Sequence, residues 1–255
     1  MGRLSGKVAV ITGGGGGIGL AAAKLFVQEG AQVLIVDIRE EALQKAVQTI
    51  GEKAVSYVRA DVTKPDQVQH YVRTAVDRYG GIDIFINNAG ILGAVKPVTD
   101  YPVEIFDKVI EVNVRGVWLG LKYVIPQMQR RGGGSIVMTS SISGVKGFPG
   151  MTGYVASKHA VVGIMRCVAN ECAPMGIRVN TVNPGAVETD MGDALAEGFA
   201  PGAREEGKRA LEAGTPLKRL ARPEEVAQMM LFLASEESGY CTGGVFGIDG
   251  GMSAL

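Results

Sequence analysis

The stretch that decides the fold is residues 7–37, KVAVITGGGGGIGLAAAKLFVQEGAQVLIVD. Its first six residues hold four consecutive apolar side chains and stop at Thr12, which is typical of a strand buried on both faces. A glycine run, Gly13–Gly17, leads into apolar residues at helical spacing, and Gly30 favours helix termination. A second apolar strand ends at Asp37. This order predicts two parallel strands joined by a right-handed helical crossover.

The same alternation continues along the rest of the chain. Further strands are expected at residues 55–58, 82–87, 135–139, 177–182 and 245–248. Helical patterns lie between them, at residues 39–50, 66–79, 153–173 and 223–234, with two further stretches within about 102–131. Strands that alternate with helices predict an α/β fold, a doubly wound parallel sheet in three layers α/β/α. Because no linker or repeat interrupts the pattern, we expect a single domain over residues 1–255.

Composition excludes several classes of protein. The 255 residues carry 26 Lys and Arg against 26 Asp and Glu, so no basic excess favours nucleic acid or a membrane surface. The apolar share of 46% excludes long disorder. Three cysteines, without metal-ligand spacing, predict a reducing compartment and no metal site. With no signal peptide and no apolar run long enough to span a bilayer, we expect a cytoplasmic protein.

The glycine run is suited to the phosphates of a dinucleotide. It lies between a strand and a helix, where backbone N–H groups at the helix N-terminus can bind a pyrophosphate. Gly19 would let that helix pack closely on the strand. Five consecutive glycines are also compatible with a flexible turn, and the loop alone does not decide between the two. No Gly-Lys-Ser/Thr follows, which excludes a P-loop.

Asp37 favours the dinucleotide interpretation and indicates which one. A carboxylate at the end of the second strand can accept hydrogen bonds from the adenosine ribose of NAD and would repel the 2′-phosphate of NADP. Ile38 follows where an Arg would favour NADP, although Arg39 is close by. The alternative is that Asp37 only caps the next helix.

Further motifs stand in order along the chain: Thr12-Gly-x-x-x-Gly17-x-Gly19, Asp61-Val62, Asn87-Asn88-Ala89-Gly90, Asn113, Ser141, Tyr154-x-x-x-Lys158 and Asn183-Pro184-Gly185. Together they resemble those of the short-chain dehydrogenases/reductases, in their short single-domain branch. The resemblance covers nearly the whole chain and implies a Rossmann-type fold with a substrate lid at about residues 188–215.

The resemblance also implies the site residues. The catalytic set would be Asn113, Ser141, Tyr154 and Lys158. The dinucleotide would be bound by Gly13, Gly16, Gly17, Ile18, Gly19, Asp37, Ile38, Asp61, Val62, Asn88, Ala89, Gly90, Tyr154, Lys158, Pro184, Gly185, Val187 and Thr189. The substrate would contact Ser141, Ser143, Tyr154, Gly185 and Met191.

Tyr154 and Lys158 suit proton transfer on physical grounds. Four residues apart on one helix, they lie on the same face. A phenol with a pKa near 10 is a poor base at neutral pH, and we expect the nearby ammonium to favour its phenolate. Tyr154 would then exchange a proton with the substrate oxygen while hydride moves to or from the nicotinamide. Ser141 would hydrogen-bond that oxygen, and the family resemblance implies that Asn113 supports a water linking Lys158 to solvent.

The expected pocket walls are mainly apolar: Ile91, Leu92, Ser143, Val145, Phe148, Met151, Ala186, Met191 and Leu195. They predict an uncharged, hydrophobic or cyclic ketone or secondary alcohol, with NAD as cofactor. A second interpretation is a reductase of 3-oxoacyl chains on acyl carrier protein. Arg130 and Arg131 favour it, whereas Asp37 opposes NADP, and Met175 stands where a docking Arg would be expected.

Two other classes remain as alternatives. A non-catalytic dinucleotide-binding protein would have no need of Ser141 and Tyr154, and sugar-nucleotide epimerases have a different glycine spacing and a longer chain. The family commonly forms tetramers through the helices at 102–131 and 153–173 and through the last strand, so we expect a homotetramer. The apolar face Val155, His159, Val162, Met165 and Ala169 suits either a helix-bundle interface or ordinary core.

Overall fold

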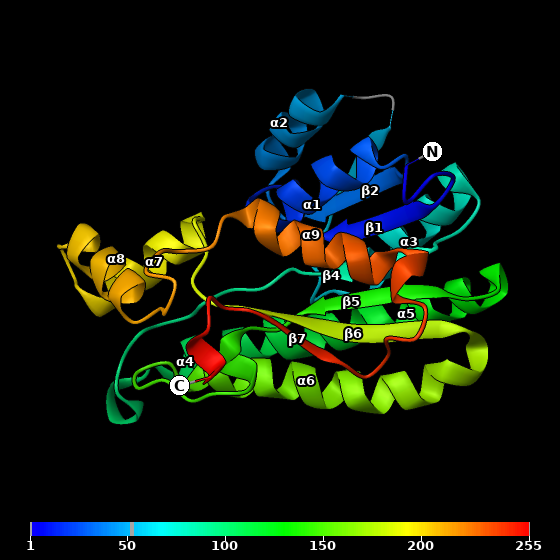
Figure 1. The fold of residues 1–255 in the computed structure, drawn as a ribbon. Coiled ribbons are helices and arrows are strands. Elements are labelled where there is room, and N and C mark those ends of the chain that lie inside the picture. The colour runs from blue at the N-terminus through cyan, green and yellow to red at the C-terminus, as the bar shows by residue number, and fades with distance from the viewer. Residues whose placement is uncertain (1, 52–53, 255) are drawn as a thin grey trace.

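A computed structural model describes residues 2–51 and 54–254, so the predicted domain over 1–255 includes four residues, 1, 52–53 and 255, outside the description. One parallel sheet, in the order β3-β2-β1-β4-β5-β6-β7, forms its centre (Figure 1). The strands are β1 (Val8–Thr12), β2 (Gln32–Asp37), β3 (Val55–Arg59), β4 (Ile84–Asn87), β5 (Gly134–Thr139), β6 (Ile177–Pro184) and β7 (Val245–Ile248). The doubly wound α/β prediction is confirmed.

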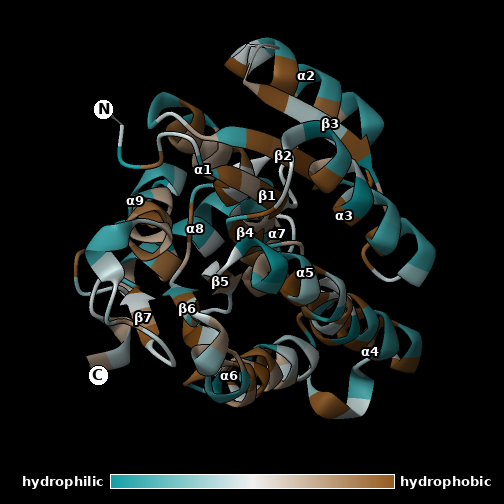
Figure 2. Cartoon of the chain, turned by 90° about the vertical axis from the view of Figure 1, so that its right-hand side faces the viewer, coloured by the Kyte–Doolittle hydropathy of each residue, from teal (hydrophilic) through white to brown (hydrophobic). Residues whose placement is uncertain are grey.

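Helices cover both faces of the sheet (Figure 2). The α-helices are α1 (Gly17–Gln28), α2 (Glu40–Ile50), α3 (Pro65–Tyr79), α4 (Val103–Ile110), α5 (Val117–Arg131), α6 (Thr152–Cys172), α7 (Asp190–Phe199), α8 (Arg204–Ala213) and α9 (Pro223–Ala234). Successive strand residues point to opposite faces, so Ala9 and Ile11 pack with α1, α2 and α9, whereas Val10 packs with α3, α5 and α6.

The chain direction across the sheet reverses between β1 and β4. β1 pairs with β2 on one side and with β4 on the other, and the strands of the two halves run outward from this junction. In such sheets ligands bind outside the carboxyl ends of the strands at the reversal. The topology therefore places a site where Gly13–Gly17 follows β1.

One predicted strand differs in detail from the structure. β4 begins at Ile84 rather than at residue 82, and just before it the Asp83 carboxylate accepts a hydrogen bond from the Val8 N–H at 2.8 Å. The two helical stretches predicted within 102–131 are α4 and α5, and a π-helical turn, η2 (Glu111–Gly116), separates them. Such turns often occur at functional positions, and Asn113 is in this one.

α7 and α8 form a pair that stands apart from the sheet, between β6 and α9 (Figure 1). They span most of the segment predicted as a lid. The predicted face of α6 is largely core, because Val162, Met165 and Ala169 are buried against the sheet. Within residues 2–51 and 54–254, no helix is long and apolar enough to cross a membrane.

Candidate active site

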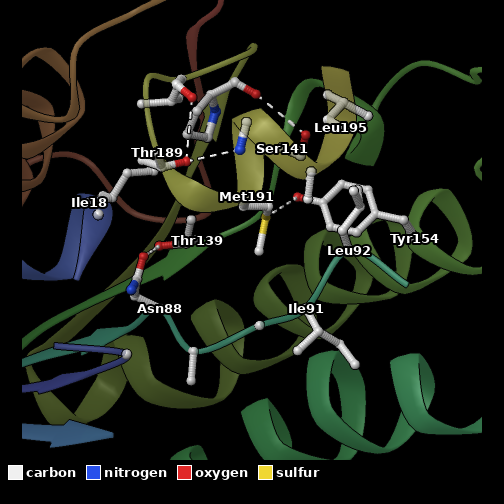
Figure 3. Close-up of a pocket in the computed structure, with 18 of the residues that line it drawn as sticks. Ile18, Asn88, Ile91, Leu92, Thr139, Ser141, Tyr154, Thr189, Met191 and Leu195 are labelled. Atoms are coloured by element: carbon white, nitrogen blue, oxygen red, sulfur yellow. Dashed lines mark hydrogen bonds between the residues drawn. The ribbon is translucent and has the colours of Figure 1, made fainter. Parts of the chain in front are cut away.

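A cavity of about 670 Å³ opens at the carboxyl end of the sheet (Figure 3). Its lining comes from the glycine loop, from the ends of β2, β4, β5 and β6, and from α6 and α7. Pockets of this size accommodate small-molecule ligands and cofactors.

The glycine loop leaves its helix N-terminus open for an anion. Gly13 and Gly17 adopt φ of +67° and +51°, which favours glycine. A side chain at Gly19 would collide with the carbonyl oxygen of Gly13, which accounts for the third glycine. Gly16 caps α1 without any side-chain hydrogen bond. The first N–H groups of α1 are therefore uncapped by side chains, which fits a bound pyrophosphate.

Asp37 lies at the cavity side of β2 and is 9% exposed. One carboxylate oxygen accepts from the Gly15 N–H at 3.2 Å. The other accepts from the Arg39 backbone at 3.1 Å and pairs with the Arg39 side chain at 3.3 Å. Ile38 beside it is half-exposed. A carboxylate fixed in this way fits the adenosine ribose of a dinucleotide.

The segment after β4 is held by the end of β1. The Thr12 hydroxyl accepts from the backbone N–H groups of Asn88 at 2.9 Å and Ala89 at 3.1 Å. The Asn88 amide donates to the Thr12 carbonyl at 3.0 Å and accepts from the Thr139 hydroxyl at 3.0 Å. These bonds join three neighbouring strand ends, so the floor of the cavity is rigid.

Ser141, Tyr154 and Lys158 converge in the cavity. The Lys158 Nζ lies 5.5 Å from the Tyr154 ring centroid and donates to the Thr139 carbonyl at 2.9 Å. The Tyr154 hydroxyl is directed at the sulfur of Met191, 4.0 Å away on α7 (Figure 3). The Ser141 hydroxyl accepts from the Ser143 N–H at 3.1 Å. The two hydroxyls and the amine therefore lie together at one end of the cavity, where the Ser141 hydroxyl also donates to the Pro184 carbonyl at 3.4 Å.

Burial dominates the ionisation of this pair. It raises the pKa of Tyr154 to about 12, although a hydrogen bond with Ser141 acts in the lowering direction. Burial also lowers the pKa of Lys158 to about 8. In the free protein, desolvation of the Tyr154 phenolate therefore outweighs the effect expected from Lys158. Both groups lose hydration inside the cavity, and desolvation disfavours each charged form.

Asn113 stands behind the cavity wall rather than in it. Fully buried in the π-helical turn, it accepts from the Ile91 N–H at 2.8 Å and donates to the Ser157 hydroxyl at 3.0 Å. A Cβ atom on Gly90 would lie 3.2 Å from the Asn113 Oδ1 and 3.5 Å from the Lys158 Nζ. Gly90 therefore allows Asn113 and Lys158 to approach the same point from two helices.

The other predicted site residues line the cavity, with two exceptions besides Asn113. Gly19 lies beneath the loop, and the predicted wall residue Val145 is a half-exposed residue outside the lining. Val145 follows the short helix η3 (Ile142–Gly144), which turns the chain away from the cavity. The lining residues that sequence reasoning did not name include Thr139, Asp190 and Met252. The sequence could have indicated Thr139 as a site residue, because Thr139 ends a strand beside Asn88.

The chain resembles known oxidoreductases over nearly its whole length. A family model described as "Enoyl-(Acyl carrier protein) reductase" matches residues 13–253. A 3-oxoacyl-(acyl-carrier-protein) reductase of Thermotoga maritima is 45% identical, over 98% of this chain and 99% of its own. A 3-alpha-(or 20-beta)-hydroxysteroid dehydrogenase of Mycobacterium bovis is 41% identical, over 99% and 92%. A cyclohexanol dehydrogenase of an Acinetobacter strain is 38% identical, over 99% and 97%.

Solved structures agree with the sequence comparison. A crystal structure of levodione reductase has a TM-score of 0.96 and 38% identity, covering 99% of this chain and 100% of that one. The structure of an NAD⁺-bound xylitol dehydrogenase has a TM-score of 0.91 and 34% identity, covering 96% and 98%. The chain belongs to the short-chain dehydrogenase/reductase family of oxidoreductases, whose members bind a nicotinamide dinucleotide.

Proposed function

We propose that this protein is an NAD(H)-dependent oxidoreductase that interconverts a secondary alcohol and a ketone, with a hydrophobic or cyclic substrate. The observation that carries the proposal is the convergence of the Ser141 and Tyr154 hydroxyls in a cavity whose remaining walls at that end are apolar. A substrate oxygen can meet both hydroxyls there, while its carbon skeleton is surrounded by Leu92, Phe148 and Met191.

Each catalytic residue has a distinct task in this proposal. Tyr154 donates its proton to the ketone oxygen in reduction and removes the alcohol proton in oxidation. Ser141 stabilises the charge that develops on the same oxygen. Lys158 replaces the proton on Tyr154 and binds the nicotinamide ribose, and Asn113 supports a water that connects Lys158 to solvent. The bound nicotinamide supplies or accepts the hydride.

We propose NAD rather than NADP as the preferred dinucleotide. The carboxylate of Asp37 is fixed at the end of β2 by Gly15, so a 2′-phosphate placed beside it would meet a negative charge. Arg39 does not offset this fully, because its guanidinium is itself engaged by Asp37 at 3.3 Å. Either choice agrees with the family's binding of a nicotinamide dinucleotide.

The substrate class rests on the lining. Leu92, Met151 and Tyr154 form a small apolar cluster with Phe148, Met191 and Leu195 packed around it. Charged substrates would lose hydration there without gaining a partner. The relatives that are named for cyclohexanol and hydroxysteroids support a cyclic alcohol or ketone.

Reduction of 3-oxoacyl chains on acyl carrier protein is the second candidate. The 45% identical relative and the family description favour it. Both arginines considered for docking are exposed, and each has a side-chain partner: Arg131 pairs with Asp83 at 3.1 Å, and Arg130 donates to Gln127 at 3.1 Å. Met175 rather than an Arg precedes Gly176. We therefore place this activity second.

We further propose a cytoplasmic homotetramer with a small-molecule substrate and neither nucleic acid nor membrane as partner. The half-exposed Trp118 on α5 is a large apolar side chain that a neighbouring subunit could cover. Light scattering measures the mass directly, and a monomeric mass would contradict this assembly.

One assay separates the candidate functions. Reduced nicotinamide absorbance is followed with cyclohexanol, a hydroxysteroid, an acyclic secondary alcohol and a 3-oxoacyl thioester, each with NAD(H) and NADP(H). We expect turnover of the cyclic substrates with NAD(H). Turnover of the thioester alone supports the second candidate. Dinucleotide binding by calorimetry without any turnover would support a non-catalytic binding protein instead.

A further inference from the structure

The last described residues of the chain form a turn beside the cavity. They follow β7, at the opposite edge of the sheet from β3, and include the short helix η6 (Met252–Ala254). Met252 lines the same cavity as Tyr154 and Asp37. Because Asp37 ends β2 in the other half of the sheet, Met252 lies toward the substrate end rather than the adenosine end.

This turn has a defined conformation. The Asp249 carboxylate accepts from the backbone N–H groups of Gly251 and Ser253, each at 2.9 Å. Gly250 adopts φ of +60°, and its carbonyl accepts from the Leu217 N–H at 3.2 Å. The turn is thereby attached to the segment that follows α8, at the far end of the α7–α8 pair.

The turn is also tied to both loops that contact the reacting groups. The Lys146 Nζ donates to the Met252 carbonyl at 3.2 Å, and the Lys146 backbone donates to Ile142, next to Ser141, at 3.0 Å. On the other side, a Cβ atom on Gly185 would lie 3.1 Å from the Cα of Asp249. A shift of the turn would therefore be felt at the Ser141 loop and at the Gly185 loop.

We propose that the C-terminal turn, residues 249–254, is a specificity element of the reaction: Met252 closes the substrate end of the cavity, and Lys146 positions it relative to Ser141. The inference rests on the proposed ketone and alcohol chemistry and adds to it the residue that limits substrate size. A methionine suits this place because its flexible, polarizable side chain adapts to apolar ligands of different shape.

The first test removes the wall. In Met252→Ala, kcat/KM for a bicyclic ketone relative to cyclohexanone should rise about tenfold or more, because a few methylene-sized groups in an apolar pocket discriminate by that factor. Met252→Leu, of similar volume, should keep the ratio within about twofold of the parent. Met229→Ala is the matched control, since Met229 is a partly buried methionine on α9 outside the cavity lining.

The second test releases the turn without changing the wall. Lys146→Met keeps most of the side-chain length and removes the donor to Met252. We expect KM for cyclohexanone to rise at least about fivefold, the equivalent of the hydrogen bond to Met252, with kcat within about twofold and the NAD dissociation constant unchanged. A merely structural role would lower the active fraction and hence kcat, and would leave KM unaltered.

A binding readout completes the experiment. With methyl-labelled methionine, the Met252 resonance is assigned from the Met252→Ala spectrum, and it should shift when cyclohexanol is added to the NAD complex while that of Met229 does not. Turnover with an unchanged size ratio and an unshifted Met252 signal would overturn the specificity role alone. Failure of the parent protein to turn over any ketone or alcohol would instead overturn the proposed function, and with it this inference.

Discussion

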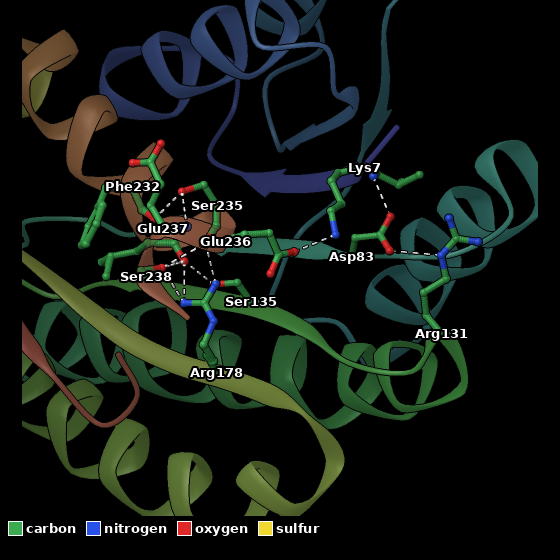
Figure 4. A network of polar contacts seen from close by, with 12 residues as sticks. Lys7, Asp83, Arg131, Ser135, Arg178, Phe232, Ser235, Glu236, Glu237 and Ser238 are labelled. Atoms are coloured by element: carbon green, nitrogen blue, oxygen red, sulfur yellow. Dashed lines mark hydrogen bonds and ion pairs between the residues drawn. The ribbon is translucent and has the colours of Figure 1, made fainter. Parts of the chain in front are cut away.

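The two ends of the sheet differ in how far their polar side chains are paired with other groups of the protein. At the carboxyl end, Tyr154 and Lys158 are buried with few internal partners and open onto the cavity. At the amino end, charged side chains are paired with one another and with backbone carbonyls (Figure 4). The first arrangement holds groups ready for a ligand, and the second closes the fold.

At the amino end, Arg178 and Ser135 connect the sheet to the end of α9. The Arg178 guanidinium donates to the carbonyls of Leu233 and Ser235 at 2.9 Å each and to the Ser238 hydroxyl at 2.7 Å. The Ser135 hydroxyl also donates to Leu233, at 2.7 Å. These bonds join β5 and β6 to the end of α9, so the segment after α9 is fixed to the sheet.

A second cavity, of about 510 Å³, lies at this amino end, and its charges are already paired. Lys7 is bonded to Glu236 at 2.9 Å and Arg131 to Asp83 at 3.1 Å. A ligand there would have to displace internal partners. The two cavities are of similar volume, and they differ in whether their charged side chains are already paired with one another.

The largest effect is expected at the carboxyl end. Tyr154→Phe should lower kcat about a thousandfold or more, since positioned acid–base groups contribute factors of this order. Dinucleotide binding should persist, because the Tyr154 hydroxyl points at Met191 and not at the glycine loop. Absorbance kinetics and calorimetry measure the two quantities, and a variant that keeps a tenth of the activity would refute the role of Tyr154.

At the amino end, the largest effect should be on stability. Arg178→Met should lower the free energy of unfolding by about 3 kcal/mol, because charged hydrogen bonds to buried carbonyls are lost. Activity per folded molecule should be unchanged. Urea unfolding measures the loss, and Arg130→Met, an exposed arginine, is the control. A loss below about 1 kcal/mol would show that the network is not a major stabilising element.

Lys158 should behave in the opposite way to Arg178, because burial of its ammonium opposes folding. Its pKa of about 8 lies below the ordinary 10.5, so the unfolded chain binds more protons between these values. The penalty is full below pH 8, at about 3 kcal/mol, and disappears as the pH approaches 10.5.

Lys158→Met should therefore stabilise the free protein by about 2 kcal/mol at pH 7, after about 1 kcal/mol is lost with the hydrogen bond to Thr139. The gain should vanish near pH 10, where the remaining penalty equals the lost hydrogen bond, and activity should be lost at every pH. Unfolding curves at pH 7 and pH 10 test the sign. Destabilisation at pH 7 would mean that Lys158 is better compensated than its burial indicates.

The smallest effect is expected for the exposed pair at the amino end. The Lys7 and Glu236 side chains are 39% and 83% exposed, so solvent screens their attraction. Glu236→Gln should cost about 0.5 kcal/mol, with no change in kcat/KM. The hydrogen bond with Lys7 lowers the pKa of Glu236, so this contribution is lost as the pH falls through that pKa. An equal cost in 1 M salt would contradict a screened ion pair.

Local periodicity was enough to predict most of the fold. The apolar runs of the strands and the helical spacing between them identified the parallel sheet, because burial on two faces leaves a distinct pattern in the sequence. Asp37 at a strand end, and Tyr154 with Lys158 one turn apart, could also be placed, since both positions follow from a single element. The π-helical turn at Asn113 could not be read in this way.

The sequence by itself thus determined the order of the elements and the residue that ends each strand, because both depend on neighbours close in the chain. Only the tertiary structure decided that Tyr154 has a raised pKa, that Val145 lies outside the cavity and that Met252 lines it. Desolvation and cavity walls arise from segments far apart in sequence, as when Lys146 binds the carbonyl of Met252. No local pattern records such contacts, since their energy depends on what surrounds each group in space.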